Sequence, residues 1–276
     1  MGSGGSQKIF VTVKSYSKRG QLLKRPDLQT LAESRDLDEL VTRIKNTKYL
    51  DAMSAIVKPY TAEKLEMALR TKLADEQFKI AKSSGNSKIL DAFFQRFIIS
   101  NLKLILKGKI LGKSQEEISA FFNMHAEELA KQRDIVVKAL VAKDLEEAVS
   151  SLGSSPFSDE IQKAVELYNE TKNIQAFDVY FDKMLYQNIT RALRSENDQD
   201  ISHIYGMETD FYNVMSIVRG KFWELEDDRI EDLVVSASVN IPNQVMERMM
   251  AAESVRDAID ELSTTRYKDL VPETED

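Results

Sequence analysis

The chain has 276 residues, no cysteine, two histidines (His125 and His203) and a formal net charge of −7 at pH 7. The lack of cysteine excludes disulfides, thiolate zinc sites and a cysteine nucleophile, and two histidines leave little imidazole for metal binding or acid–base catalysis. The acidic balance, without a dominant basic block, argues against a nucleic-acid partner. The length allows one or two globular domains with a large core.

The start of the chain carries no targeting signal in its sequence pattern. Residues 1–6, Met-Gly-Ser-Gly-Gly-Ser, predict a loose Gly/Ser tail, because the apolar core of a signal peptide is missing. Ile9–Val13 is the one strand-like run, but five residues cannot form a sheet alone, so a helix start fits equally well. The longest apolar stretch, Ala92–Leu106, is interrupted by polar residues and is too short for a membrane span of roughly 20 residues.

Apolar side chains recur at helical spacing along most of the chain, and a capping box at Ser114–Glu117 predicts a further helix start. Few glycines and prolines are present to punctuate strands, so the predicted fold class is all-α with ten or more helices. The apolar stripes span residues 37–44, 65–73, 94–106, 118–122, 161–168, 177–185 and 211–222.

Two blocks of sequence recur at nearly the same interval. Arg35–Ile44 aligns with Lys143–Leu152, and its continuation from Ile44 to Asp51 returns at Leu262–Asp269. A second block, Asn101–Lys109, aligns with Asn213–Lys221. Because two unrelated blocks agree on one interval, they indicate a repeated multi-helix lobe of about 110 residues.

The repeats divide the predicted body, residues 7–276, into two full copies and the opening of a third. The copies cover residues 35–142, 143–252 and 253–276. The third copy holds only its opening, so the third lobe is predicted to be incomplete.

The order of these motifs resembles a known family. A Leu-Asp-Glu-Leu-Val opening, then Thr-Lys-Tyr, then a helix carrying Asn and ending in Lys-Gly-Lys or Arg-Gly-Lys is similar to the C subunit of archaeal A-type ATP synthases, a relative of the d subunit of vacuolar ATPases. The resemblance runs from about Ser15 to Leu270 and is carried by Asp36–Met53, Asn101–Lys109, Met207–Lys221 and Val255–Leu270.

The resemblance implies a fold and a function. It implies three similar helical lobes arranged as a funnel around a pseudo-threefold axis. It also implies a non-catalytic central-stalk subunit that links the central shaft to the membrane rotor ring and transmits torque for proton or sodium-ion transport. Its partners would be shaft and ring subunits. It would lie at the cytoplasmic side of the membrane, touching the membrane only through the ring, and would need no cofactor.

Six residues at equivalent repeat positions are candidates for partner contacts. The amides, if buried, need hydrogen-bond partners, so they either fix their own lobe or contact a partner at the funnel mouth. The cations lie at predicted helix C-termini, where they either complement the helix dipole or form a basic face for an acidic partner. The candidates are Asn101, Lys107, Lys109, Asn213, Arg219 and Lys221.

Other suggestive patterns favour structural roles. Gly108–Ser114 resembles a phosphate-binding P-loop with one residue too few, but it follows a helix rather than a strand. We therefore predict a helix C-cap at Gly108, an N-cap at Ser114, and no ATP site. The acidic run from Glu224 to Asp232 lacks a calcium-loop pattern and fits a solvated helix start. No catalytic or metal site is predicted.

Three aromatic side chains could anchor a partner if they face outward, and would otherwise be core: Phe222, Trp223 and Tyr267. Two other functions stay open at this stage. One is a helical-repeat adaptor that binds a partner helix or peptide. The other is an all-α enzyme, which the scarcity of histidine and the absence of a catalytic motif disfavour.

Overall fold

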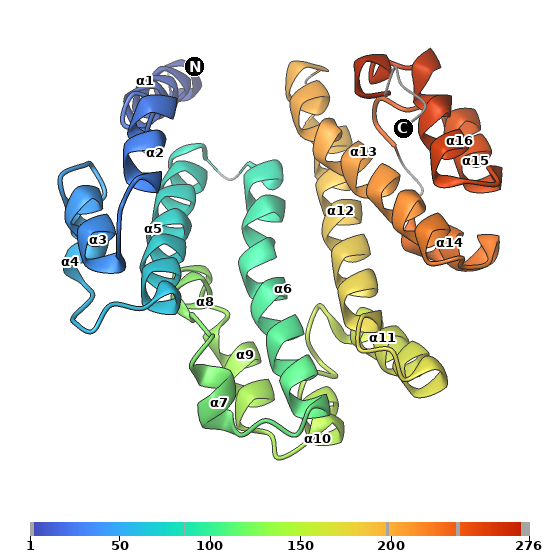
Figure 1. Cartoon of the computed structure of the whole chain (residues 1–276), viewed down its shortest axis with the longest axis horizontal. Coiled ribbons are helices and arrows are strands. Elements are labelled where there is room, and N and C mark those ends of the chain that lie inside the picture. The colour runs from blue at the N-terminus through green and yellow to red at the C-terminus, as the bar shows by residue number, and fades with distance from the viewer. Residues whose placement is uncertain (1–2, 86, 197–198, 236–237, 272–276) are drawn as a thin grey trace. The chain divides into compact units, whose positions relative to one another are not determined.

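The structure is a computed structural model that describes residues 3–85, 87–196, 199–235 and 238–271. Every regular element within these ranges is helical, which confirms the predicted all-α class (Figure 1). Among the described residues, no helix has both the length and the apolar character that crossing a membrane requires.

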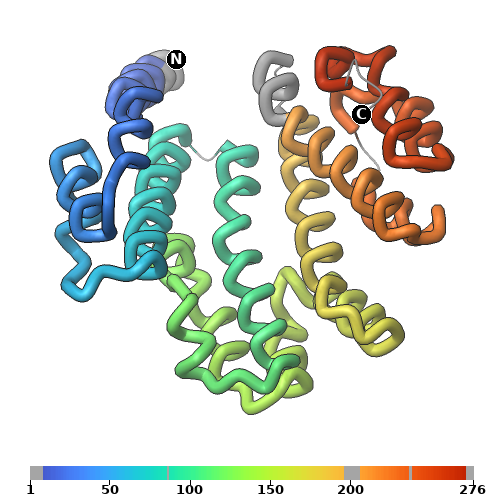
Figure 2. The backbone as a smooth tube through the Cα atoms, viewed as in Figure 1, coloured from blue at the N-terminus to red at the C-terminus, as the bar shows by residue number. Residues whose placement is uncertain are grey.

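The chain forms two compact units, Met1–Ser155 and Pro156–Asp276 (Figure 2). The first unit contains ten helices within its described residues. They are α1 (Ser3–Arg19), α2 (Arg25–Ala32), α3 (Leu37–Lys45), α4 (Leu50–Ser54), α5 (Ala62–Ser83), α6 (Lys88–Ile110), α7 (Gln115–Ser119), α8 (His125–Ala130), α9 (Arg133–Val141) and α10 (Leu145–Ser151).

The long helix α6 forms the centre of the first unit. Leu102, Ile105 and Leu106 are completely buried, because α5, α8, α9 and α10 all pack against this helix. A second cluster, with Val41, Met53 and Leu65 among its members, joins α3, α4 and α5. The wide apolar stripe that predicted an enclosed helix at residues 94–106 is thereby confirmed.

The second unit is built around two long helices. Its elements are α11 (Ser158–Thr171), α12 (Ala176–Glu196), α13 (Gln199–Phe222), α14 (Asp227–Leu233), α15 (Asn243–Ala251), α16 (Val255–Asp260) and the short 3₁₀-helices η1 (Glu261–Thr264) and η2 (Lys268–Leu270). Phe177 and Phe181 of α12 are fully buried. Ile217 of α13 shares a core cluster with residues of α14, α15 and α16.

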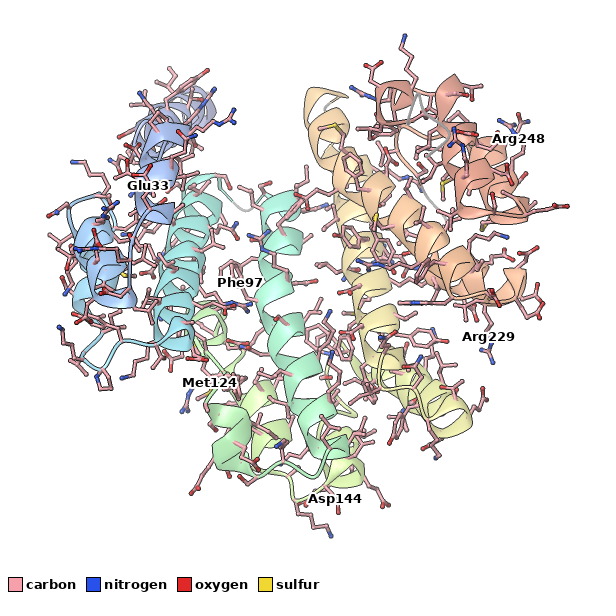
Figure 3. All side chains as sticks on the ribbon, in the orientation of Figure 1. Glu33, Phe97, Met124, Asp144, Arg229 and Arg248 are labelled. Atoms are coloured by element: carbon pink, nitrogen blue, oxygen red, sulfur yellow. The ribbon has the colours of Figure 1, made fainter. Side chains whose placement is uncertain are left out.

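Each repeat opens with the same kind of N-cap. Asp36, Asp144 and Ser254 accept hydrogen bonds from the backbone N–H three residues later, at 2.8, 2.9 and 3.1 Å. Asp144 marks the start of α10 in Figure 3. The first compact unit extends to Ser155, past the repeat boundary predicted at Lys143, because α10 packs against α6 and α9.

The strand-like run Ile9–Val13 lies inside helix α1, which begins at Ser3, within the segment predicted to be a tail. Two lysines of this helix contact α5: Lys14 Nζ donates to Ser83 Oγ at 2.6 Å, and Lys18 Nζ lies 2.8 Å from Glu76 Oε2. The apolar residues Ile9, Phe10, Val13 and Tyr16 are exposed.

A close contact fixes the end of α6 and corrects the predicted C-cap at Gly108. The helix continues to Ile110, and Gly108 lies inside it because Ile118 packs on its backbone. A Cβ at Gly108 would stand 2.7 Å from Ile118 Cγ1. The left-handed residue is Gly112, with a φ of +64°, and Lys113 N–H donates to Gly108 O at 2.9 Å. The N-cap predicted at Ser114 is confirmed.

The second unit repeats this corner at the equivalent position of its own long helix. A Cβ at Gly220 would stand 2.6 Å from Ile230 Cγ1, and Leu225 N–H donates to Gly220 O at 2.9 Å. Glu224 takes the left-handed position, with a φ of 55°. We call these two turns the Gly-Lys corners, residues 107–118 and 219–230.

We expect Gly108→Ala and Gly220→Ala each to lower the free energy of unfolding. Alanine gains about 1 kcal/mol in helix propensity over glycine. Overpacking against Ile118 or Ile230 costs about 1–3 kcal/mol, which exceeds that gain. Urea denaturation followed by circular dichroism measures the change.

Ile118→Ala provides the matched control for Gly108→Ala. The double variant should lose less than the sum of the single losses, because removing the isoleucine makes room for the new methyl group. A Gly108→Ala variant that is more stable than the unchanged chain would contradict the close contact.

Candidate functional site

Asn101 and Asn213 occupy equivalent positions on the two long helices, and both are buried. Asn101 Nδ2 donates to Asn123 O at 2.7 Å, and Asn213 Nδ2 donates to Val235 O at 3.0 Å. Each bond reaches 22 residues along the chain. Asn213 Oδ1 also accepts from Val235 N–H at 2.8 Å. These bonds are those of the lobe-fixing alternative, and a partner contact at either amide stays a prediction.

The four candidate cations take two different orientations. Lys109 Nζ donates to Leu140 O, in the last turn of α9, at 2.8 Å and also to Ala142 O, just after that helix. Lys221 Nζ lies 2.8 Å from Asp227 Oδ1, and its side chain is only 10% exposed. Lys107 is half-buried and Arg219 is exposed. Lys109 and Lys221, the second cation of each pair, therefore bind groups within their own unit. Arg219 is exposed and accessible to a partner.

Large apolar side chains project from the Gly-Lys corners. Leu111 is 65% exposed, Phe222 is 74% exposed and Trp223 is 49% exposed. Leu111 and Trp223 are equivalent residues, each two positions after the last lysine of its corner motif. The outward orientation that would make Phe222 and Trp223 anchors is thus observed, whereas Tyr267 is buried. Sequence reasoning missed Leu111, although its place directly after Lys109-Ile110 matches that of Trp223 after Lys221-Phe222.

A buried carboxylate that sequence reasoning missed organises the end of the second unit. Asp210 of α13 is fully buried and accepts hydrogen bonds from Val239 N–H at 2.8 Å, Asn240 N–H at 3.0 Å and Tyr267 OH at 2.8 Å. A buried carboxylate needs several donors to offset its lost hydration. Burial, together with the hydrogen bond to Asp210, raises the pKa of Tyr267 well above its usual value. This network attaches the opening of the third repeat to α13.

A second buried carboxyl group lies in the first unit. Glu127 of α8 is fully buried, and its Oε1 accepts a hydrogen bond from Asn101 Nδ2 at 2.6 Å. Its other oxygen has no hydrogen-bond partner among the described residues. Burial raises the pKa of Glu127 above its ordinary value of 4.5. Asn101 therefore donates two hydrogen bonds with different roles. One binds the backbone of Asn123, and the other stabilises the buried carboxyl group of Glu127.

Among the described residues, the side chains that sequence analysis considered do not form a catalytic or metal-binding site. Among them, no group of three or more acidic, histidine or cysteine side chains could hold a metal ion. His125 Nε2 lies 2.7 Å from Asp75 Oδ1, and the side chain of His203 lies outside the described residues. In the segment resembling a P-loop, Lys113 Nζ lies 2.8 Å from Glu117 Oε1, between two helices.

The described residues therefore form two helical units, each with a buried amide and a close glycine contact on its long helix. The family model described as ATP synthase (C/AC39) subunit matches residues 11–276, so the chain belongs to that family. Membership confirms the resemblance inferred from the motifs.

Curated relatives that are named as the C subunit of an A-type ATP synthase come from several archaea. The relative from Methanocaldococcus jannaschii is 26% identical over 96% of this chain and 67% of its own length. The relative from Methanosphaera stadtmanae is 23% identical over 95% of this chain and 67% of its own length. The relative from Thermococcus kodakarensis is 24% identical over 95% of this chain and 69% of its own length.

Asn213→Ala should lower the free energy of unfolding by about 1–3 kcal/mol. The substitution leaves the N–H and C=O of Val235 buried without a hydrogen-bond partner. The folded state then carries the whole free-energy cost of removing these groups from water. Asn243→Ala, at an exposed position on α15, is the control and should change the value by less than about 0.5 kcal/mol. Equal losses in the two variants, measured by urea denaturation, would argue against the lobe-fixing role.

Glu127→Gln should change how stability depends on pH. Because the pKa of Glu127 is raised in the folded protein, the folded state binds the proton more tightly than the unfolded state. The resulting stabilisation is complete below the ordinary pKa of 4.5 and is lost as the pH rises through the raised pKa. The glutamine does not titrate, so the stability of the unchanged chain should fall relative to this variant as pH rises above about 4.5.

Urea denaturation between about pH 4 and pH 8 measures this difference. The two free energies of unfolding should differ least at the low end of this range and separate as the pH rises. Parallel profiles for the unchanged chain and Glu127→Gln would mean that Glu127 is ionised alike in the folded and unfolded states.

Proposed function

We propose that the chain is a non-catalytic central-stalk subunit of a rotary ATP synthase or ATPase. In this role it links the central shaft to the membrane rotor ring and transmits torque for proton or sodium-ion transport. The observation that carries the proposal is the family match over residues 11–276. The archaeal relatives, which share one name as the C subunit of an A-type ATP synthase, point to the same assembly.

The packing of the long helices suits a part that transmits force. A helix that carries torque must not slide along its neighbours, so it needs attachment at several points along its length. Asn101 holds the middle of α6, and the contact of Gly108 with Ile118 together with the bonds of Lys109 holds its end. Close packing of this kind transmits strain rather than absorbing it.

The exposed apolar residues of the Gly-Lys corners are the partner contacts that we propose. Large aromatic side chains at a surface are typical energetic centres of protein interfaces. Phe222 and Trp223 stand beside the exposed Arg219, so this corner offers an apolar anchor and a cation together. Such a surface fits a helical shaft subunit with acidic residues beside its apolar stripe.

The proposed location follows from the proposed assembly. The chain would lie at the cytoplasmic side of the membrane and touch it only through the ring. ATP binding and hydrolysis would belong to other subunits, so the chain alone should not hydrolyse ATP, and Lys113→Ala should leave that result unchanged.

We expect the double substitution Phe222→Ala with Trp223→Ala to weaken partner binding about tenfold or more. Both side chains are exposed, so thermal stability should change little. Biolayer interferometry against purified shaft subunits and the purified rotor ring of an archaeal A-type ATP synthase measures the affinity. Val57→Ala, at another exposed apolar position, is the control. If the unchanged chain binds neither shaft nor ring, the stalk role is wrong.

A further inference from the structure

A hollow of about 370 Å³ lies in the second unit, where α14 packs against α12 and α15 (Figure 1). Val234 and Met246, which line it, are buried, and Met250 is half-buried, so one side of the hollow is apolar. Lys183 of α12 is the one basic residue of its lining within the part of the chain that the structure describes. The hollow therefore brings a single amine beside an apolar wall.

The hydrogen bond of Lys183 does not require the amine to be charged. Lys183 Nζ donates to Asp232 O at 3.0 Å. This partner is a backbone carbonyl group, which accepts a hydrogen bond from a neutral amine as well as from an ammonium group. Lys221 differs, because its Nζ lies 2.8 Å from the carboxylate of Asp227, and a carboxylate stabilises the charged form. Lys183 can lose its proton and keep its partner.

The surroundings of Lys183 favour the neutral amine. Burial lowers the pKa of Lys183 below its ordinary value of 10.5, because the charged form loses hydration. The charge of Lys163 lowers this pKa further, whereas Asp232 and Glu231 act against the shift. The carboxylates that line the hollow are exposed, so water weakens their effect on the amine. We call these carboxylates the acidic rim: Asp228, Glu231, Asp232 and Glu247.

A neutral amine beside an apolar wall has the two properties that an acylation site needs. Its lone pair can attack an activated carbonyl carbon, as desolvated lysines do. The wall formed by Val234 and Met250 offers a place for an acyl chain. The amide that results retains one N–H, so it can still donate to Asp232 O. The modification also removes a partly buried charge, which lowers the desolvation cost of the site.

We propose that Lys183 is a site of covalent acylation by short-chain acyl thioesters, with the acyl chain held in the hollow. The Lys183 nitrogen bonds to the thioester carbonyl carbon, the carbon–sulfur bond breaks, and the amine proton passes through water to the departing thiolate. An uncharged thioester suits the acidic rim, which repels anionic donors such as acyl phosphates. The proposal rests on the second unit alone and does not depend on the stalk function.

The first test compares two lysines of the unchanged chain. The chain is treated with the acetyl thioester of N-acetylcysteamine near neutral pH, and mass spectrometry of its peptides gives a rate for each lysine. Lys183 should be acetylated at least about fivefold faster than Lys163, which is exposed on the neighbouring helix α11. Unfolding in concentrated urea should bring the two rates to within about twofold, because the folded environment is lost. A folded-state rate at Lys183 that is no higher than that at Lys163 would overturn the proposal.

The pH dependence of the same rates separates activation by burial from simple access. A group with a lowered pKa loses its proton at a lower pH. Acetylation of Lys183 should therefore reach half of its maximal rate at a lower pH than acetylation of Lys163. Coincident profiles would show that Lys183 behaves as a surface lysine, and the proposal would then be wrong.

The second test asks whether the hollow holds the acyl chain. With the butyryl thioester in place of the acetyl thioester, the rate at Lys183 relative to Lys163 should rise about threefold or more, because the longer chain covers more apolar surface. Met250→Ala should remove this rise, and Gln244→Ala, at an exposed position of α15 outside the hollow, should keep it. Circular dichroism verifies that both variants are folded. In the unchanged chain, a relative rate that does not rise with the butyryl donor would overturn the proposal.

Acetyl phosphate identifies the class of donor. Its negative charge meets the acidic rim, so the rate at Lys183 relative to Lys163 should be lower with acetyl phosphate than with the acetyl thioester. An equal or higher relative rate with acetyl phosphate would refute the assignment of thioesters as the donors.

Discussion

The close approach of a glycine backbone to an isoleucine side chain fixes how the long helix meets the next short helix in both units. At Gly108 and Gly220, a single Cβ would collide with Ile118 or Ile230 at 2.7 or 2.6 Å. The long helix can therefore lie directly on the short helix that follows the turn. That short helix sets the direction of the next segment, whose backbone then meets Asn101 or Asn213. A side chain in place of the glycine would push the two helices apart at this point and would strain the hydrogen bond of the buried amide.

Each long helix is held by several contacts, and each of them contributes only a small free energy of stabilisation. A hydrogen bond from a buried amide contributes about 1 kcal/mol net. Two units use the same attachments at equivalent positions, from the amide at Asn101 or Asn213 to the left-handed residue at Gly112 or Glu224. Several local attachments along one helix resist its sliding against its neighbours. Such resistance is what the proposed torque-transmitting role requires.

The helices were predictable from sequence because their apolar periodicity is local, and the stripes at residues 94–106 and 177–185 lie inside α6 and α12. The position of Gly108 inside the helix was not predictable from sequence. A glycine within a helix and a glycine just after one give the same local pattern, and only the packing of Ile118 distinguishes them. The Asp210–Tyr267 bond joins residues 57 positions apart, and no local pattern encodes such a pair. The candidate lysines show the same limit, since charge alone does not reveal that Lys109 reaches carbonyl groups 31 and 33 residues away.

The first opening, α2–α3, and the third, α15–α16, pack on different neighbouring helices. This difference explains which of the two exposes apolar side chains. The third opening lies on a preceding long helix, so its side chains are covered, and Tyr267 is fixed further by its hydrogen bond to Asp210. The first opening instead packs on helices that follow it, through Val41, Met53 and Leu65. Packing on the following helices buries Val41 and partly covers Leu40, whereas Leu37 stays 37% exposed. Among the described residues, the first opening has neighbours mainly on one side, and Leu28 and Leu37 are therefore exposed.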